Sequence, residues 1–521
     1  MPKYAAVDIG SNSLRLLVAE AQPGERLPKL ARLAEDREVT RLGESVFHDG
    51  AVSADAMRQV TAVLERMRAT WQSFDVAGIR VVATSATRDA SNRDEFIARA
   101  AAAVGAPVET ISGQEEARLI HLGVECVWPH PDERMLLIDV GGGSAELILA
   151  EHGRMAAAWS RPLGAVRLNE VFLQADPPAE AELERLREFI EEKISIALPS
   201  LAGKRFDRVI ATSATASAAV CAIHRIARTR REGADRLRVT TAQLRRLYRD
   251  LCARTLAQRR KVIGIGPRRA EIIVPGVAVL LTVLETAKLP GLAYCSAGVR
   301  DGIVADLAMR GVGRERERLS RDQLRVVERL AKRFGVDLVH ARQLADFARE
   351  IFTALEPLHR LPPFFGKLLE AACYLCDTGH FISDTSHHKH SHYIVFHSDL
   401  AGFTDAERGL IAMLCRYHRR ALPSAKHADY QLLDPERKRA LQTMIPILRL
   451  ADGLDRTRTQ RVESVGCEVD TASVRLKLRS HGDTNLEQWA VEQVAEPFRA
   501  VYNRSLTVSV ERVRGPRSRA I

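Results

Sequence analysis

The sequence predicts an α/β protein made of two related α/β domains, followed by an all-helical region and a small α+β unit. Three observations lead to this prediction. Strand and helix patterns alternate over residues 1–310. The segment "VDIGSNSLRLLV" (7–18) returns as "IDVGGGSAELIL" (138–149), as expected of a duplicated unit. From about residue 315 the pattern turns helical, and alternating stretches reappear near 462.

The predicted elements of the first part follow the chain in a regular order. Residues 1–19 alternate like two strands joined by the polar turn "GSNS", and a helical pattern over 53–73 starts at Ser53. Next come a buried strand with a polar end (79–87), a helix (93–104), the strand "PVETIS" and the helix "GQEEARLIHLGV". After the second copy, a long charged helix covers 178–198, and "RVIATSATASAAV" (208–220) predicts a strand, a tight turn and a helix.

The second part of the chain has a different pattern. Residues 320–460 are almost all helical and include the histidine cluster "SHHKHSHY" (386–393). Two alternating stretches, a helix and the segment "SLTVSVERV" then fill the region from about 462 to 512. With "RGVGRERERLSRD" (310–322) as the linker, these patterns predict domains at 1–127, 128–310, 315–460 and 461–521.

Composition limits the classes of ligand and compartment. The formal net charge is +11, and only 12 of the 77 basic residues are lysine. A genomic bias toward arginine would explain this excess, but the planar arginine fork also binds phosphate through two contacts, so a polyanionic ligand is the functional alternative. No apolar run is long enough to cross a bilayer and the N-terminus enters a strand at once, so we expect a cytoplasmic protein without a membrane partner. The eight scattered cysteines are expected to be free thiols.

The pattern D-x-G-x-x-S occurs in both copies, between two strands. This places it in a hairpin loop, which argues against a dinucleotide-binding fold, and no Walker-type GxxxxGK[ST] motif is visible. Glycines let backbone N–H groups point into a concavity that binds phosphate, polar side chains add donors, and aspartates can hold magnesium. Glycine-rich turns without a chemical role are the weaker interpretation, because two copies match. The candidate substrate-binding residues are Ser11, Asn12, Ser13, Gly141, Gly142, Gly143 and Ser144, and the candidate metal-binding residues are Asp8 and Asp139.

Further motifs accompany the two loops. They are "VVATSATRDASN" (81–92), "ISGQEEARLIHLGV" (111–124), "RPLGAVRLNE" (161–170), "PRRAEIIVPGVAVL" (267–280) and "SAGVRDGI" (296–303). With these motifs the chain resembles the exopolyphosphatase and guanosine-pentaphosphate phosphohydrolase family, closely over about residues 1–310 and in outline beyond. The resemblance implies two actin-like (ribonuclease H-like) domains with a central cleft, to which each domain contributes one phosphate loop.

The resemblance also implies roles for single residues. The family's catalytic glutamate in G-x-x-E-A-R is Glu116 here, and a carboxylate there can accept a proton from the attacking water. Its neighbour Glu115 is the rival, because adjacent helical residues point about 100° apart and only one can face a given cleft. Glu146 joins Asp139 as a metal-binding acid, and Arg88 matches the arginine that clamps phosphate in the active site.

One stretch departs from the family. Where the family usually has a glycine-containing turn, near residues 211–215, this chain has "ATSAT". In actin-like folds the corresponding region helps to hold a nucleotide base. The departure therefore favours a linear polyphosphate over a guanosine substrate.

The helical region resembles the HD phosphohydrolase fold, in which a histidine, a His-Asp pair and a late aspartate surround a metal ion. The matching positions here are His340, Cys376-Asp377 and Asp452, so cysteine replaces the histidine of the pair. Cysteine suits soft metals, and we therefore expect an inactive domain rather than a working metal centre. Further nitrogen ligands for a metal could come from His387, His388, His390 and His392. The expected role of the domain is to lengthen a polyanion channel with Arg416, His418, Arg419 and Arg420.

These interpretations together predict an exopolyphosphatase, which releases terminal orthophosphate from inorganic polyphosphate with magnesium or manganese and water. Guanosine-pentaphosphate 5′-phosphohydrolase is the alternative in the same class, and both activities can coexist. An actin-like kinase would need an intact nucleotide turn, and a non-catalytic polyphosphate-binding regulator would be expected to lose Glu116. The resemblance further implies a homodimer, a monovalent cation as an optional second ion, and no specific nucleic-acid partner.

Overall fold

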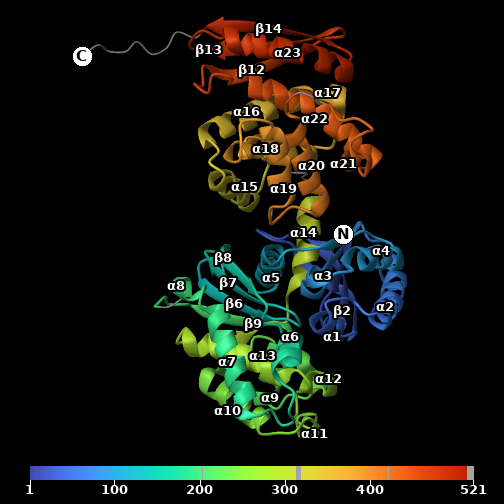
Figure 1. Cartoon of the computed structure of the whole chain (residues 1–521), viewed down its shortest axis with the longest axis vertical. Coiled ribbons are helices and arrows are strands. Elements are labelled where there is room, and N and C mark those ends of the chain that lie inside the picture. The colour runs from blue at the N-terminus through green and yellow to red at the C-terminus, as the bar shows by residue number, and fades with distance from the viewer. Residues whose placement is uncertain (202, 312–317, 420–421, 513–521) are drawn as a thin grey trace, which may run out of the picture. The chain divides into compact units, whose positions relative to one another are not determined.

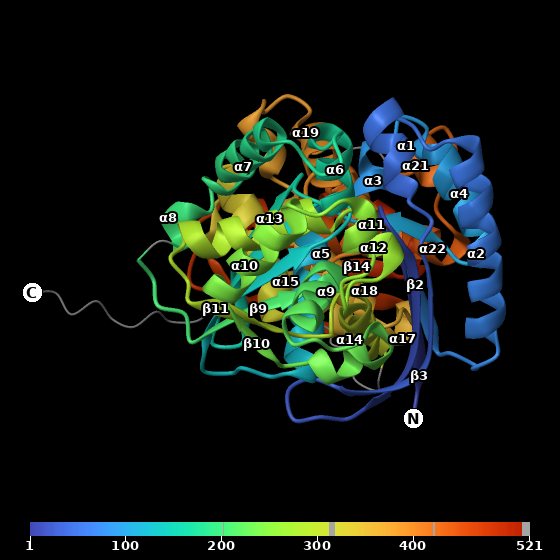
Figure 2. The same ribbon diagram turned by 90° about the horizontal axis from the view of Figure 1, so that it is seen from below.

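The computed structural model describes residues 1–201, 203–311, 318–419 and 422–512. The chain divides into two compact units, residues 1–312 and 313–521, and each is described by itself (Figures 1 and 2). In the first unit the elements follow the predicted alternation of strands and helices. In the second unit helices come first and a small sheet follows.

The first sheet of the first unit has the strand order β3-β2-β1-β4-β5. Strands β1, β2 and β3 are antiparallel neighbours, whereas β4 and β5 run parallel to β1. The strands are β1 (Lys3–Ile9), β2 (Leu14–Gln22), β3 (Lys29–Glu38), β4 (Gly78–Ala83) and β5 (Val108–Thr110). The helices that accompany them are α1 (Leu42–Asp49), α2 (Ala54–Gln72), α3 (Ser85–Asp89), α4 (Arg93–Val104) and α5 (Gly113–Val127).

The second sheet of the first unit repeats this arrangement and adds one edge strand, in the order β10-β11-β9-β6-β7-β8. Its strands are β6 (Arg134–Val140), β7 (Ala145–Glu151), β8 (Arg154–Arg161), β9 (Arg208–Thr212), β10 (Arg238–Thr240) and β11 (Gly291–Tyr294). Its α-helices are α6 (Ala165–Phe172), α7 (Glu180–Ile194), α8 (Leu198–Leu201), α9 (Ser213–Ile223), α10 (Thr241–Cys252), α11 (Leu256–Arg259), α12 (Pro267–Ala270), α13 (Ile273–Thr286) and α14 (Val299–Gly311). A 3-10 helix covers Arg228–Ala234.

The two sheets share one topology, in which β6, β7, β8, β9 and β11 take the places of β1 to β5. Strand directions agree as well, because β6, β7 and β8 are antiparallel neighbours and β9 and β11 run parallel to β6. The duplication predicted from the repeated twelve-residue segment is therefore confirmed at the level of whole sheets. The mixed α/β architecture agrees with the actin-like fold that the sequence predicts.

Helices α5 and α14 join the two halves of the first unit. Leu119 on α5 and Ile303 on α14 share a buried cluster with Leu17 of the first sheet, whereas Ile120 on α5 belongs to a cluster with Leu137 of the second sheet. Figure 1 shows α14 running between the parts built on the two sheets. Although α14 follows the second sheet in sequence, it packs on β1 and β2 of the first.

The second unit is built around one continuous core, which includes side chains from both its helices and its sheet. Its helices are α15 (Arg321–Arg333), α16 (Leu338–Ala354), α17 (Glu356–His359), α18 (Phe364–Leu375), α19 (His387–Phe396), α20 (Asp405–Tyr417), α21 (Ala428–Gln431), α22 (Pro435–Leu454) and α23 (Asn485–Tyr502), with a 3-10 helix at Thr378–Phe381. Strands β12 (Val462–Val469), β13 (Ser473–Ser480) and β14 (Ser505–Arg512) form a sheet in that order. The predicted helical and α+β regions are both present, and the likeness to the HD fold stays a prediction.

Two expectations from composition concern the chain as a whole. The eight cysteines, all of which lie within the described residues, are free thiols. Among the described helices, none combines the length and the apolar character that crossing a bilayer requires.

Candidate active site

The two D-x-G-x-x-S segments form matching hairpin loops at the ends of the paired strands β1–β2 and β6–β7. In the first loop the Gly10 N–H donates to the Ser13 carbonyl at 3.2 Å, and in the second the Gly141 N–H donates to the Ser144 carbonyl at 3.0 Å. The same turn is therefore built twice, as the sequence predicts. In each copy the aspartate is the second-last residue of the strand that enters the loop.

The two loops lie against each other, and glycine makes this approach possible. A Cβ atom on Gly142 would lie 2.9 Å from the Asn12 nitrogen, and one on Gly143 would lie 2.6 Å from the Ser11 hydroxyl. A larger residue would force the loops apart. The Ser11 hydroxyl also accepts a hydrogen bond from the Ala86 N–H in α3, which fixes the first loop to that helix.

Four acidic side chains gather at these loops, and we call them the carboxylate cluster: Asp8, Glu116, Asp139 and Glu146. All four are electrostatic neighbours of at least one other member. Burial, followed by Asp8 and Asp139, raises the pKa of Glu116 to about 7, against the partial compensation of Arg88. Burial and the neighbouring acids also raise the pKa of Asp8 and, well above its usual range, that of Glu146, and burial raises the pKa of Asp139. The cluster therefore lacks enough positive charge to keep all four groups ionised.

Glu146 has an unused ligand atom within this cluster. Its side chain is completely buried, and the Ser160 hydroxyl donates to one oxygen, Oε1, at 2.8 Å. The other oxygen, Oε2, is buried and has no hydrogen-bond partner among the described residues. The Thr212 hydroxyl donates to Asp139 in the same sheet. Buried carboxylate oxygens are rarely left unsatisfied, and Oε2 of Glu146 is of the type that could bind a hard cation.

The neighbouring acids Glu115 and Glu116 face different surroundings. Glu115 is buried in an ion-pair network with Arg80 and Arg118, and both arginines also contact Asp306. Burial alone would raise the pKa of Glu115, but the two arginines hold it below its ordinary value. Glu116 instead joins the carboxylate cluster. The helix thus separates a residue that supports the fold from one that faces the loops.

Arg88 lies beside Glu116. Its guanidinium donates to the Ile111 carbonyl at 2.7 Å and to the Glu116 carboxylate at 3.1 Å. This position brings together the two residues that the sequence predicts to be catalytic. It also lets Arg88 orient the carboxylate of Glu116, a contact that the sequence did not indicate.

A set of basic residues that sequence reasoning missed lies next to the carboxylate cluster, and we call it the arginine cluster: Arg15, Arg37, Arg269 and Arg300. Arg15 is the direct neighbour of both Asp8 on β1 and Arg37 on β3. Burial and nearby arginines lower the pKa of Arg37 to about 9, and burial and Arg15 lower that of Arg269 to about 10. Within the part of the chain that the structure describes, the buried Nε atom of Arg37 has no hydrogen-bond partner.

The repeated segment contained one sequence signal for the arginine cluster. Arg15 occupies the place in the first copy that Glu146 occupies in the second, and both follow their loop on the strand that leaves it. Like charges directly opposite one another destabilise a ladder, so a negative charge beside Arg15 and Arg37 would relieve their repulsion. No feature of the sequence pointed to Arg37, which is distant in the chain.

Arg167 is a second residue that sequence reasoning missed. It donates to the Gly143 carbonyl at 2.8 Å and to the Ser85 hydroxyl at 3.2 Å, and it forms an ion pair with Asp89. Its guanidinium also lies 3.9 Å from the centre of the Phe47 ring. These contacts tie the second loop to α3, which begins beside the first loop.

The stretch "ATSAT" forms a tight turn without glycine. Ser213 adopts φ 73°, a left-handed conformation that non-glycine residues rarely take, and its hydroxyl donates to the Val140 carbonyl at 2.9 Å. Thr215 donates to the same carbonyl at 3.1 Å. The turn for which the family uses glycine is therefore present, held by two hydroxyl hydrogen bonds.

Several residues predicted to matter in the second unit have structural partners. His340 Nδ1 lies 2.7 Å from Asp455, and its Nε2 atom is 3.9 Å from Asp452. Burial, and then Asp377, raise the pKa of the Cys376 thiol well above its usual range, which disfavours a metal-binding thiolate. His418 is buried rather than open to a polyanion.

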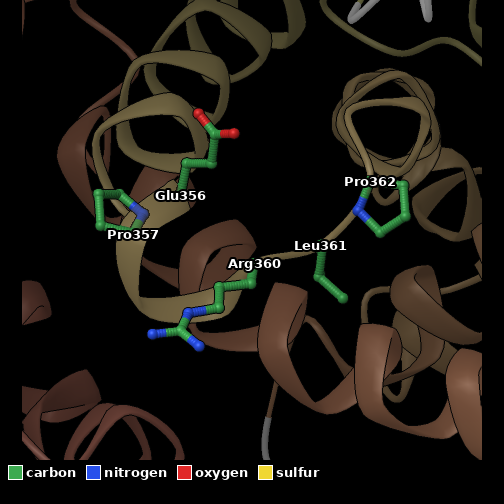
Figure 3. A pocket seen from close by; sticks show the side chains of 5 residues that line it. All are labelled: Glu356, Pro357, Arg360, Leu361 and Pro362. Atoms are coloured by element: carbon green, nitrogen blue, oxygen red, sulfur yellow. The ribbon is translucent and has the colours of Figure 1, made fainter.

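The predicted polyanion contacts in this unit differ in their surroundings. Arg416 lies 3.7 Å from Asp429, and Arg419 is half-buried just after α20. Arg420 lies outside the described residues. A surface hollow elsewhere in the unit is lined by Glu356, Pro357, Arg360, Leu361 and Pro362 (Figure 3). One basic residue, Arg360, and one acidic residue, Glu356, line this hollow, so its lining has no excess positive charge for a polyanion.

The fold is that of an actin-like protein, with duplicated sheets and two facing loops. The carboxylate cluster and the arginine cluster lie next to each other at these loops. A model of the Ppx/GppA phosphatase family matches residues 17–310, and a model of domain III of that family matches residues 323–494. The chain therefore belongs to the Ppx/GppA phosphatase family.

Solved structures agree with this assignment. The chain is 27% identical to the Aquifex aeolicus member of the Ppx/GppA family, with a TM-score of 0.52, over 60% of this chain and 99% of the other. It is 26% identical to an exopolyphosphatase-like protein, with a TM-score of 0.55 and the same two coverages. An exopolyphosphatase from Cytophaga hutchinsonii shares the fold at 24% identity and a TM-score of 0.54, again over 60% and 99% of the two chains.

Proposed function

We propose that the protein is an exopolyphosphatase, which hydrolyses the terminal phosphoanhydride bond of inorganic polyphosphate. The observation that carries this proposal is the meeting of the carboxylate cluster and the arginine cluster at Asp8, which interacts with Asp139 on one side and with Arg15 and Arg300 on the other. One site thus offers positive charge for a phosphate chain and negative charge for its counter-cation. Hydrolysis of a phosphoanhydride depends on both.

The arginine cluster supports a linear polyanion as substrate. The charged neighbours that shift the pKa of Arg37 are all arginines, and the like charge of Arg15 lies directly opposite it in the ladder. A chain with charge on every phosphate would neutralise several of these groups together and supply acceptors for guanidinium N–H donors such as the unpaired Nε of Arg37.

The carboxylate cluster supports a hard divalent cation, magnesium or manganese. Its donor atoms are all carboxylate oxygens, which is the ligand type that these ions prefer. Asp139 and Glu146 would hold the ion, with Asp8 close by, and the unpartnered Oε2 of Glu146 is the free ligand atom. When bound, such an ion supplies positive charge that offsets repulsion between the carboxylates and the substrate phosphates.

In the proposed reaction Glu116 is the general base. It accepts a proton from the attacking water as the water oxygen bonds to the terminal phosphorus, and the anhydride P–O bond breaks to release a shortened chain and orthophosphate. Arg88 positions the Glu116 carboxylate through its 3.1 Å hydrogen bond. A base with a pKa of about 7 is well matched to proton transfer near neutral pH. In this proposal the loop N–H groups and Ser13 orient the phosphates.

Guanosine pentaphosphate is a second candidate substrate. The observation that favours it is the turn at Ser213, which forms although glycine is missing from "ATSAT". The absence of glycine from this stretch is therefore a weaker argument against a nucleotide substrate than it was before the turn was observed.

The experiment that tests the proposal compares phosphate release from long polyphosphate, tripolyphosphate and guanosine pentaphosphate, with and without magnesium. We expect cation-dependent release, fastest from long polyphosphate. Faster hydrolysis of guanosine pentaphosphate would assign the second candidate instead. Release from none of the three would contradict hydrolysis of these substrates altogether.

A further inference from the structure

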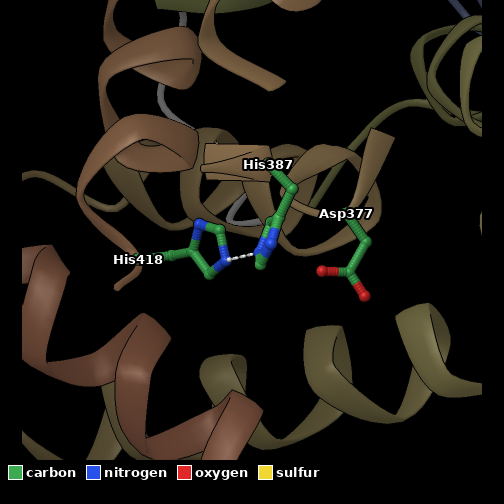
Figure 4. A group of neighbouring side chains, drawn as sticks. All are labelled: Asp377, His387 and His418. Atoms are coloured by element: carbon green, nitrogen blue, oxygen red, sulfur yellow. Dashed lines mark hydrogen bonds between the residues drawn. The ribbon is translucent and has the colours of Figure 1, made fainter. Parts of the chain in front are cut away.

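A group of three buried side chains in the second unit lies apart from the carboxylate cluster in sequence and chemistry. It consists of Asp377 just after α18, His387 at the start of α19 and His418 just after α20, and one potential ligand atom from each lies within 4.8 Å of the others. The exposed fractions are 8% for Asp377, 2% for His387 and 3% for His418. Figure 4 shows the two imidazoles side by side, with the Asp377 carboxylate on the other side of His387.

Backbone carbonyls fix which nitrogen of each imidazole carries hydrogen. His387 Nδ1 lies 3.2 Å from the Asp384 carbonyl, and His418 Nδ1 lies 2.6 Å from the Cys415 carbonyl. A carbonyl only accepts hydrogen bonds, so Nδ1 must be the donor in both rings. In a neutral imidazole the Nε2 atom then presents a lone pair.

These two lone pairs point at each other. The Nε2 atoms of His387 and His418 are 3.2 Å apart, and neither has a hydrogen to offer the other when both rings are neutral. Two facing acceptors repel, so a positively charged species belongs between or beside them. A metal ion and a shared proton are the two species that meet this requirement.

The separation fits two ligands of one metal ion. With metal–nitrogen bonds of about 2.0–2.1 Å and ligand angles between about 90° and 109°, the two nitrogens would be about 2.8–3.4 Å apart. The orienting carbonyls are also typical of metal-bound histidines, whose second nitrogen commonly donates to a carbonyl or carboxylate.

We propose that Asp377, His387 and His418 form a binding site for a divalent transition-metal ion, such as zinc, in the second unit. Two imidazoles and one carboxylate suit zinc and the neighbouring ions of the first transition row better than magnesium. Three protein ligands leave at least one coordination position for water. This set differs from the one predicted by motif, because His387 and His418 supply the nitrogens and Cys376 supplies no ligand.

The neighbours of Asp377 leave one of its two carboxylate oxygens open. Arg458 contacts Oδ2 of Asp377, while His380 Nε2 lies 3.6 Å from the other oxygen, beyond hydrogen-bonding distance. One carboxylate oxygen therefore remains for the metal. The Nε2 atom of His340, a neighbour of Asp377, is also buried and makes no hydrogen bond to any described residue, so a third unused imidazole nitrogen borders the group.

The test is metal binding by the full chain, stripped with a chelator and then titrated with zinc in excess magnesium, which occupies the oxygen-only site. Calorimetry and metal analysis are expected to give one zinc per chain. His387→Gln and His418→Gln should each weaken zinc binding by more than about 100-fold, since even loss of an outer-shell partner costs about 10–100-fold. His390→Gln, on the same helix but only half-buried, is the matched control and should bind as the unaltered chain does.

A measurement on the unaltered chain guards against variants that fail to fold. X-ray absorption of the zinc-loaded protein should show two imidazole ligands, and cobalt in place of zinc should give a visible spectrum with nitrogen ligation. Oxygen-only ligation would place the metal elsewhere and overturn the proposal. So would the absence of stoichiometric binding by the unaltered chain, which would leave the shared proton as the species between the rings, or equal affinity in all three variants.

Discussion

Glu115 and Glu116 are adjacent residues of one type, yet their different environments indicate different roles. Glu115 is paired with Arg80 and Arg118, whereas Glu116 lies among other carboxylates and beside Arg88. Glu116→Gln is expected to lower turnover of polyphosphate by about 10²–10⁴-fold, the usual contribution of a general base. Substrate binding should survive, because the arginine cluster is unaltered. Steady-state kinetics and a binding assay with unhydrolysed polyphosphate measure the two effects.

Glu115→Gln is the matched control for this substitution. It breaks a buried ion-pair network, so it should lower the melting temperature more than Glu116→Gln does, with a much smaller effect on turnover. Equal losses of turnover in the two variants, or a loss confined to Glu115→Gln, would show that Glu116 is not the base.

The raised pKa of Glu116 gives the reaction a specific dependence on pH and on metal. The base must be ionised, so at low magnesium kcat/KM should rise with pH through about 7. Magnesium adds positive charge near the carboxylates and should move this acidic limb to lower pH. Rate profiles at several magnesium concentrations measure the shift, and a limb that stays in place would contradict it.

The acids of the carboxylate cluster give folding stability a pH dependence opposite to that of a carboxylate in an ordinary ion pair. Their raised pKa values mean that the folded protein holds protons that the unfolded chain releases. Without metal, stability should therefore fall as pH rises from about 4.5 toward about 7. Added magnesium should raise the melting temperature more at about pH 8 than at about pH 5. A calorimetric melting series at both pH values decides this.

At the scale of elements, the duplicated hairpins have diverged at one ladder position. The strand leaving the first loop carries Arg15, next to Asp8 and opposite Arg37, and the strand leaving the second carries Glu146, next to Asp139. One fold, used twice, thus presents a cation on one side and an extra carboxylate on the other. The proposed binding of phosphate on one side and of metal on the other depends on this single difference in side-chain type.

Arg37→Met tests the basic side of this arrangement. Removing one of several like charges should raise the melting temperature of the ligand-free protein, because repulsion with Arg15 is relieved. The same change should raise KM for polyphosphate by about 10–100-fold, since hydrogen bonds to charged groups contribute about 1.5–3 kcal/mol. Thermal melts and kinetics check both. Arg246→Met, at an exposed position of α10, should change neither, and a fall in stability of Arg37→Met would contradict the proposed repulsion.

Glu146→Gln tests the acidic side. It keeps the shape of the side chain but removes charge and a ligand oxygen, so the magnesium concentration for half-maximal rate should rise by at least about 10-fold. Asp139→Asn should act in the same direction. Magnesium titrations of the hydrolysis rate measure this, and an unchanged midpoint in both variants would remove them from the metal site.

At the scale of the whole molecule, the first unit carries both charged clusters within residues 1–312. The Aquifex aeolicus relative matches 60% of this chain with 99% of its own length, so proteins of about that size form this fold. A chain ended at residue 312 should therefore fold and hydrolyse short polyphosphates. It should bind long polyphosphate more weakly, because basic residues such as Arg416 and Arg419 are lost, and the difference should shrink as salt rises.

Circular dichroism must first establish that the shortened chain is folded, because its binding can be interpreted only for a folded protein. Binding of long polyphosphate is then compared between the full and shortened chains across a salt series. Equal affinity at low salt would show that the second unit contributes no contacts to the phosphate chain.

The sequence by itself determined the repeat, the order of the elements and most of the loop residues. Hydrophobic periodicity and the matched D-x-G-x-x-S segments are local signals, so the helix that starts near Ser53, the helix at 93–104 and the two hairpins could be predicted from them. The tertiary structure alone decided that Arg37 lies opposite Arg15, that Arg88 contacts Glu116, and that His387 faces His418. These contacts join residues that are distant in the chain, and side-chain patterns carry no information about them until strands and helices pack. The same packing desolvates the carboxylates and so sets the pKa on which the proposed chemistry depends.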